Sequence, residues 1–160
     1  MMTTLSTLIT DFFMTHLAKE RNASGHTVMA YRDTLKMLLC FAAHFLSRTV
    51  DHLSFEHLSP EVILEFLNHL ENIRRNTVRS RNARLATIHS FFRYVLSREP
   101  ALASRCQQVL TIPFKKSTQP ALGYLSEEEI RCLLSQVDRS ALHGERDYLL
   151  LALLYDTGAR

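Results

Sequence analysis

The chain has 160 residues, 46% of them apolar, with only four glycines and four prolines. This composition excludes a largely disordered chain, and its helix-forming residues favour an all-α fold of one domain, or of one domain and part of another. The net charge of +3 is uneven, because residues 74–120 carry +9 whereas residues 1–73 and 121–160 carry −3 each. A strongly basic segment between two acidic ones predicts a polyanionic partner for that segment.

Apolar residues recur at helical rather than strand spacing over almost the whole chain. We expect a first helix over residues 4–19 and, after a turn at Gly25, a second helix over residues 27–46. A third helix is expected over residues 60–72, because Ser59 followed by proline is typical of a helix N-terminus. The second half of the second helix is apolar nearly all round, which predicts that it lies at the centre of a helical bundle.

A fourth helix is predicted over residues 76–98, where the apolar stripe continues until Pro100 stops it. Residues 1–100 are therefore expected to form the first domain. A short helical turn fits residues 101–107. The segment "TIPFKKSTQPALGY" that follows has two prolines and no helical or strand periodicity. We predict a linker over residues 101–120.

Helical patterns resume after the linker, in residues 121–160. Ser126 and Glu129 have the spacing of a capping box at a helix start. A second helix is predicted in "HGERDYLLLALLYDTG", with Gly158 as the left-handed residue that ends it. Its residues 145–157 are apolar around most of the helix circumference. We predict two helices that open a second, incomplete domain.

The segment "RRNTVRSRNARLATIHSFFRYVLSR" holds seven arginines and no acidic residue. At 100° per residue, Arg79 and Arg93 fall opposite the apolar stripe, and so does Arg75 near the start of the helix. Arg84 flanks the stripe. Arg81 falls on the line of the stripe itself, so its side chain would have to reach past the edge of the core.

Arginines on one helix suit the backbone of DNA or RNA, because guanidinium groups hold phosphate oxygens bidentately and counterion release drives binding. Small polar residues between the arginines allow close approach. The alternative is an exposed face with salt bridges, which requires acidic residues four positions away, and the segment has none. We predict DNA contacts from Arg75, Arg79, Ser80, Arg81, Arg84, Arg93, Lys115 and Lys116.

The sequence indicates no other chemistry. Its eight histidines form no metal-binding motif, and no glycine-rich phosphate loop or hydrolase motif is present. Three cysteines, odd in number and far apart, favour the reduced thiols of a cytosolic protein. The longest apolar run, residues 148–155, is too short to span a membrane. We therefore predict a cytoplasmic, nucleoid-associated protein with no cofactor, metal, small-molecule substrate or membrane partner.

Three segments carry a resemblance to a known family: "SGHTVMAYRDTLKMLLCF", "RNARLATIHSFFRYVLSREP", and "YLSEEEIRCLL" with "GERDYLLLALLYDTGAR". In this order they resemble the N-terminal part of the tyrosine recombinases, the phage integrase family. The first two look like helices of its four-helix, SAM-like core-binding domain, and the third looks like the start of its catalytic domain. The resemblance implies an all-α chain that clamps one face of a DNA duplex, with other recombinase protomers as further partners.

The resemblance also assigns a role to Arg160. In the family, the arginine of the T-G-x-R motif contacts the scissile phosphate, and Arg160 holds that position here. The family's remaining catalytic residues lie further downstream, and none of the five tyrosines matches the context of the nucleophile. We therefore expect DNA binding without catalysis. We expect the N-terminal portion of an integrase-type recombinase, from a truncated or disrupted gene or a mobile element.

Three alternatives remain open. The apolar helix at residues 145–157 would suit an interaction protein that docks on an intact recombinase. The chain would also be an enzyme if a second chain supplied the rest of its site. Pull-down of an intact recombinase without DNA tests the first alternative, and trapping of a covalent DNA adduct tests the second. The third, an unrelated helical bundle, treats the T-G-x-R context as a coincidence.

Overall fold

The computed structural model describes residues 4–116 and 123–158, and every regular element in these ranges is helical. The all-α prediction is therefore confirmed. The chain divides into two compact units, residues 1–117 and 118–160. The helices of the first unit are α1 (Leu5–Asp11), η1 (Phe12–Glu20), α2 (Gly25–Phe45), η2 (Val50–His52), η3 (Phe55–His57), α3 (Pro60–Asn72), α4 (Val78–Arg98), η4 (Pro100–Leu102) and α5 (Ala103–Leu110).

Four helices of the first unit begin at a polar cap. The side chains of Thr4, Ser24, Ser59 and Thr77 each accept the backbone N–H three residues further on. Such a cap satisfies one of the backbone donors that a helix N-terminus leaves free. The predicted start of the third helix is confirmed. The second helix begins at Gly25 rather than at residue 27, because Ser24 is its cap.

The first predicted helix has a different geometry from the one expected. Its second part, η1, is a nine-residue π-helix, so the α-helical pattern ends at Asp11 although the chain remains helical to Glu20. A π stretch of this length is rare. It presents Phe12 and Leu17 to the interior, where both are fully buried.

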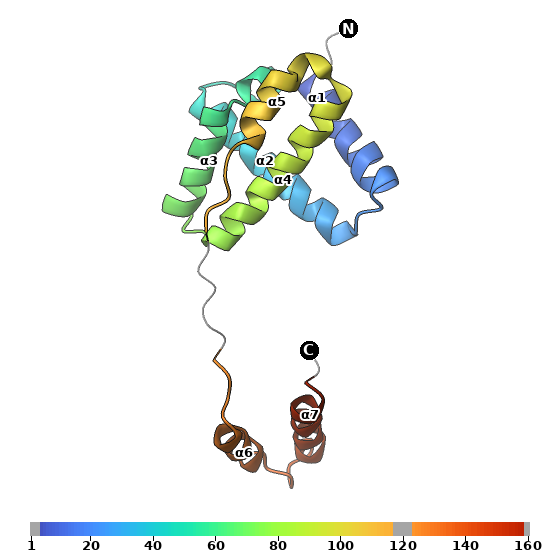
Figure 1. Cartoon of the computed structure of the whole chain (residues 1–160), viewed down its shortest axis with the longest axis vertical. Helices are drawn as coiled ribbons and strands as arrows, with labels where there is room; N and C mark the ends of the chain where they lie inside the picture. Colours follow the sequence, from blue (N-terminus) through green and yellow to red (C-terminus); the bar gives the residue numbers. More distant parts are fainter. Residues whose placement is uncertain (1–3, 117–122, 159–160) are drawn as a thin grey trace. The chain divides into compact units, whose positions relative to one another are not determined.

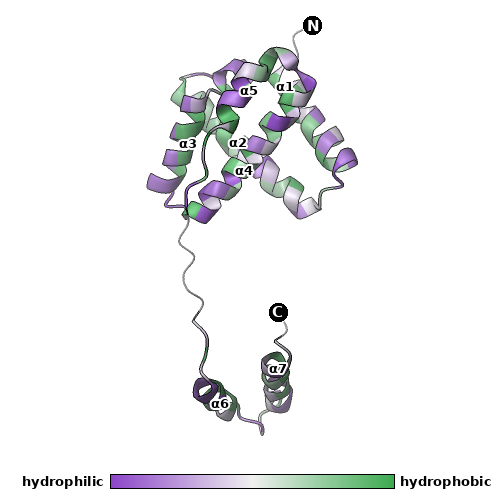
Figure 2. Ribbon diagram, viewed as in Figure 1, coloured by the Kyte–Doolittle hydropathy of each residue, from purple (hydrophilic) through white to green (hydrophobic). Residues whose placement is uncertain are grey.

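Helix α4 lies across α2 and contacts η1, α3 and α5 (Figure 1). Hydrophobic and hydrophilic residues alternate along the ribbons of these helices (Figure 2), as expected for amphipathic helices around a shared core. The largest fully buried side chains come from η1, α2, the η3–α3 connection, α3 and α4: Phe12, Leu17, Leu38, Leu58, Ile63, Phe66, Leu67, Leu70, Leu85, Ile88, Phe91 and Phe92.

Helix α5 belongs to the first unit, beyond the predicted domain boundary at residue 100. Its side chains Cys106 and Val109 are fully buried against the core, and Ile112 of the following segment is nearly so. Burial also raises the pKa of the Cys106 thiol to about 11. Part of the predicted linker is thus a packed element of the bundle.

The second unit contains α6 (Glu127–Ser135) and α7 (Gly144–Thr157). The capping box predicted for Ser126 and Glu129 is present, and Gly158 has the predicted left-handed conformation, with φ = 60°. Among the residues described in this unit only Gly144 is buried. The apolar residues of α7 are therefore mostly open to solvent.

Candidate nucleic-acid interface

Helix α4 presents one continuous face to solvent. The face is formed by positions at helical spacing, namely Arg79, Ala83, Ala86, Ser90 and Arg93, of which Ser90 is half-buried and the others are exposed. The side chains of alanine and serine in the middle of this face are small. An extended polyanion can therefore approach the helix backbone closely between the two arginines. Neither arginine forms an ion pair with any residue that the structure describes.

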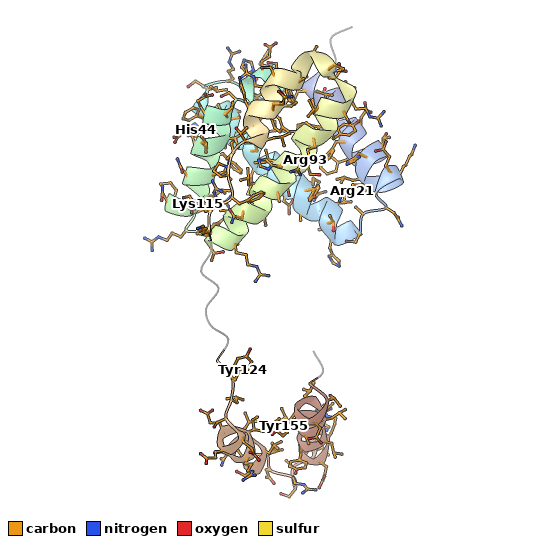
Figure 3. The ribbon with its side chains drawn as sticks, in the orientation of Figure 1. Arg21, His44, Arg93, Lys115, Tyr124 and Tyr155 are labelled. Atoms are coloured by element: carbon orange, nitrogen blue, oxygen red, sulfur yellow. The ribbon has the colours of Figure 1, made fainter. Side chains whose placement is uncertain are left out.

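A third arginine joins this face from another element. Arg21, which follows η1, places its Nη1 atom 3.5 Å from the Ser90 hydroxyl oxygen, on the side of α4 that also carries Arg93 (Figure 3). Sequence reasoning missed Arg21, because nothing in the sequence shows that it packs beside a helix almost seventy residues downstream. We call Arg21, Arg79, Ser90 and Arg93, with the alanines between them, the α4 face.

Arg98 differs from the arginines of the α4 face. Its Nη2 atom donates to the Glu20 carboxylate at 2.6 Å. This carboxylate also accepts a hydrogen bond from His16. The pKa of Glu20 is lowered mainly by the His16 hydrogen bond and to a smaller extent by the positive charge of Arg98. The acid that neutralises Arg98 comes from η1, so the α4 face ends before the last turn of the helix.

Arg81 lies inside the bundle rather than on the exposed surface. Its side chain is 4% exposed, and its Nε atom is 3.9 Å from the Glu71 carboxylate. Its Nη1 atom donates to the backbone oxygen of Pro113 at 3.3 Å and to Asn82 Oδ1 at 3.1 Å. The lack of acids within the arginine segment did not exclude an ion pair, since Glu71 comes from α3. The free domain therefore does not offer Arg81 to DNA, contrary to the prediction.

Lys115 is held by the same group of residues. Its Nζ atom donates to Glu71 at 2.6 Å, its backbone N–H donates to Asn82 Oδ1 at 3.1 Å, and its backbone oxygen accepts from Asn82 Nδ2 at 2.7 Å. We call Glu71, Arg81, Asn82 and Lys115 the linker clamp. Lys116, next in the chain, is exposed and has no partner among the described residues. The clamp fixes the start of the predicted linker against α4.

Three other predicted residues, Ser80, Arg84 and Arg75, lie in the first turns of α4 or just before it. Ser80 is exposed, with its hydroxyl 3.0 Å from that of Thr77. Arg84 is half-buried and reaches toward α2. Arg75 is exposed and has φ = 52°, the left-handed region, which costs a non-glycine residue about 1–2 kcal/mol. Arg160 lies outside the described residues.

His89 is buried beside this region, and its Nε2 atom has no hydrogen-bond partner among the described residues. Burial, with help from the charge of Arg93, lowers the pKa of His89 below its usual 6.5, and a hydrogen bond with the Val109 backbone opposes this only in part. The folded state therefore favours neutral His89, whereas the unfolded chain takes up a proton at higher pH.

We expect the free energy of unfolding to fall as the pH is lowered through the usual histidine pKa, from about pH 7.5 to about pH 5.5. The stabilisation from neutral His89 is complete above the unfolded-state pKa and is lost below it. Urea denaturation across this range, on the wild type and on His89→Gln, measures the effect. The substitution is expected to reduce the acid-side slope, and identical slopes would contradict the assignment to His89.

Neither a metal site nor a membrane-spanning helix is found in the described ranges. No group of three or more His, Cys, Asp or Glu side chains lies close enough to hold a metal ion there. None of the described helices is long and apolar enough to cross a membrane.

Residues 10–99 match the model of the phage integrase N-terminal SAM-like domain. The chain belongs to this family. The domain so identified covers η1, α2, α3 and α4, and therefore contains the whole α4 face. The tyrosine recombinase resemblance and the SAM-like fold class are both confirmed.

Relatives of this chain include a Sinorhizobium fredii protein named integrase/recombinase y4rC, 41% identical over 98% of the chain and 47% of its own length. A second protein of that organism, named y4rD, is 40% identical over 98% of the chain and 56% of its length. The tyrosine recombinase XerC of Staphylococcus haemolyticus is 31% identical over 92% of the chain and 46% of its length. The chain thus spans about half the length of these relatives. No solved structure matches it significantly.

Proposed function

We propose that this chain binds double-stranded DNA through the α4 face, as the core-binding part of an integrase-type recombinase. The observation that carries the proposal is the position of Arg21, Arg79 and Arg93 on one exposed face, with no acidic partner among the described residues. Arg75, exposed in the connection between α3 and α4, adds a further positive charge just before the start of α4. Lys116 extends the positive charge beyond the helix.

We propose further that the chain binds DNA without cleaving it. Covalent strand transfer requires an activated nucleophile in the site. The tyrosines of this chain do not suit that role, because no hydrogen bond joins a tyrosine hydroxyl to another described residue and burial raises the pKa of Tyr94. Incubation with a DNA duplex carrying a relative's recombination site is expected to give no covalent adduct.

Replacing Arg79 with alanine tests DNA binding directly. We expect about tenfold weaker affinity on every duplex sequence and a salt dependence shallower by about one unit, because one phosphate contact is lost. Titration of labelled duplexes at several salt concentrations, followed by fluorescence anisotropy, measures both. Arg48→Ala is the matched control, since it removes an exposed arginine that lies outside α4. A wild-type affinity that does not change with salt would overturn the proposal.

Helix α7 favours a second function, docking on an intact recombinase. Its residues Leu149, Leu150, Leu153 and Leu154 are 48–61% exposed, an unusually apolar surface for one helix. This function predicts capture of a purified full-length relative by the wild-type chain in the absence of DNA. A Leu149→Glu, Leu153→Glu variant is expected to lose the capture and keep its DNA affinity. Failure of the wild type to capture the relative would remove this candidate.

A further inference from the structure

Two arginines from different parts of the chain lie along one face of α2. Arg84 places its Nη1 atom 3.5 Å from the hydroxyl oxygen of Thr34, and Arg74 places its Nη1 atom 3.0 Å from the sulfur of Met37. Thr34 and Met37 are three positions apart on α2, so they are neighbours on the helix surface. The two guanidinium groups therefore lie about one helical turn apart.

Neither guanidinium has an anionic partner. The structure describes no carboxylate within 4.0 Å of Arg74 or Arg84. The Nε atom of Arg84 is buried and makes no hydrogen bond to the described residues. Thr34 donates its hydroxyl hydrogen to the backbone oxygen of Ala30 and accepts from Arg84 only at the long distance of 3.5 Å. Beyond the contacts to Thr34 and Met37, neither guanidinium makes a hydrogen bond to a described residue, and Arg84 Nε is the buried donor of the pair.

The local charge balance also disfavours this pair in the free protein. Burial is the main cause that lowers the pKa of Arg84, and the positive charge of Arg74 adds to it. Asp33 acts in the opposite direction, but its side chain is 61% exposed and its closest ion pair is with Arg32 at 3.9 Å. A half-buried cation next to a like charge costs free energy unless an anion compensates for it.

We propose that Arg74 and Arg84 form a binding site for one phosphate group of the DNA backbone, between α2 and the start of α4. A phosphate carries non-bridging oxygens that accept from guanidinium groups bidentately, and it supplies the missing negative charge. The assignment to DNA rests on the proposed function. The site is separate from the α4 face, and its empty form destabilises the folded domain.

This proposal predicts opposite effects on stability and affinity from one substitution. Arg84→Met keeps the apolar stem and removes the unpaired charge, so the melting temperature of the free protein is expected to rise by a few degrees. The affinity for duplex DNA is expected to fall about tenfold, with a salt dependence shallower by about one unit. Arg74→Met, at an exposed position, is expected to weaken binding to a similar extent without risk to folding.

Arg79→Met is the matched control, because it removes an exposed arginine from the same helix as Arg84. It is expected to weaken DNA binding and to leave the melting temperature unchanged. Inorganic phosphate provides a probe independent of DNA. At equal ionic strength, phosphate is expected to raise the melting temperature above its value in chloride more for the wild type than for the Arg74→Met, Arg84→Met variant.

The outcomes separate this site from the proposed function. If Arg79→Met weakens DNA binding and the Arg74 and Arg84 variants do not, the phosphate site is wrong and DNA binding stands. A lower melting temperature for Arg84→Met with unchanged affinity would also overturn the site, since Arg84 would then be purely structural. If none of the variants alters DNA binding, the proposed function fails, and the comparison of phosphate with chloride still decides whether the anion site exists.

Discussion

Replacing Phe12 with alanine is expected to lower the free energy of unfolding by about 3–5 kcal/mol, the usual cost of removing a buried phenylalanine ring. Phe12 is fully buried, and its ring centroid lies 5.3 Å from that of Phe91, 5.5 Å from that of Tyr94 and 6.1 Å from that of Tyr31. It therefore joins η1 to both α2 and α4. A loss of this size is a large part of the stability of a small domain.

Urea denaturation followed by circular dichroism measures the loss. Met14→Ala is the matched control, because Met14 lies two residues away on the same π-helix with 65% of its surface exposed. Its substitution is expected to change the free energy of unfolding by less than about 0.5 kcal/mol. Similar losses for the two variants would show that η1 is not packed as described.

The Phe12 substitution also bears on the α4 face. Arg21 reaches Ser90 only because η1 is fixed against α4. Loosening η1 frees Arg21 from this position without altering its charge. Under conditions where Phe12→Ala remains folded, its affinity for DNA is therefore expected to be lower than that of the wild type. Arg21→Ala, which removes the charge itself, is expected to lower the affinity as well.

Local signals in the sequence were enough to predict most of the helices. A serine cap followed by proline set the start of α3, and a capping box set the start of α6. Angular spacing also placed the arginines well: Arg75, Arg79 and Arg93 are exposed, Arg84 is half-buried and Arg81 is buried. These features depend on residues within one or two turns of each other, which is why the sequence alone reveals them.

Features that depend on contacts between distant residues could not be predicted in this way. The sequence of α5 and its following segment reads as a linker, but Cys106, Val109 and Ile112 are buried by side chains from other helices. Arg21 joins the α4 face through a contact 69 positions away. Pairing across such distances is set by the packing of the bundle, and no local periodicity encodes it.

The linker clamp leads to the second large effect. Glu71→Gln is expected to lower the free energy of unfolding by about 2–3 kcal/mol, because it removes the only carboxylate paired with the buried Arg81 side chain in the described structure. The loss is smaller than for a fully buried ion pair. Glu71 is 15% exposed, and Arg81 keeps its hydrogen bonds to Asn82 and Pro113.

The same substitution is expected to strengthen DNA binding. Glu71 holds the Lys115 Nζ atom at 2.6 Å, so the glutamine variant releases that ammonium group for contact with phosphate. The salt dependence is expected to become steeper by up to about one unit. A variant that is less stable and yet binds more tightly cannot be explained by partial unfolding, since an unfolded population lowers the apparent affinity.

Glu65→Gln separates the clamp from a simple change in net charge. Glu65 lies exposed on the same helix and makes no ion pair with the described residues. Its substitution by glutamine removes one negative charge, as Glu71→Gln does, without affecting the contacts of Arg81 or Lys115. It is expected to leave stability unchanged and to strengthen DNA binding much less. If both variants behave alike, Glu71 acts only through long-range charge. If Glu71→Gln alone loses stability and gains affinity, the clamp restrains a DNA-binding lysine in the free domain, and phosphate competes with Glu71 for it.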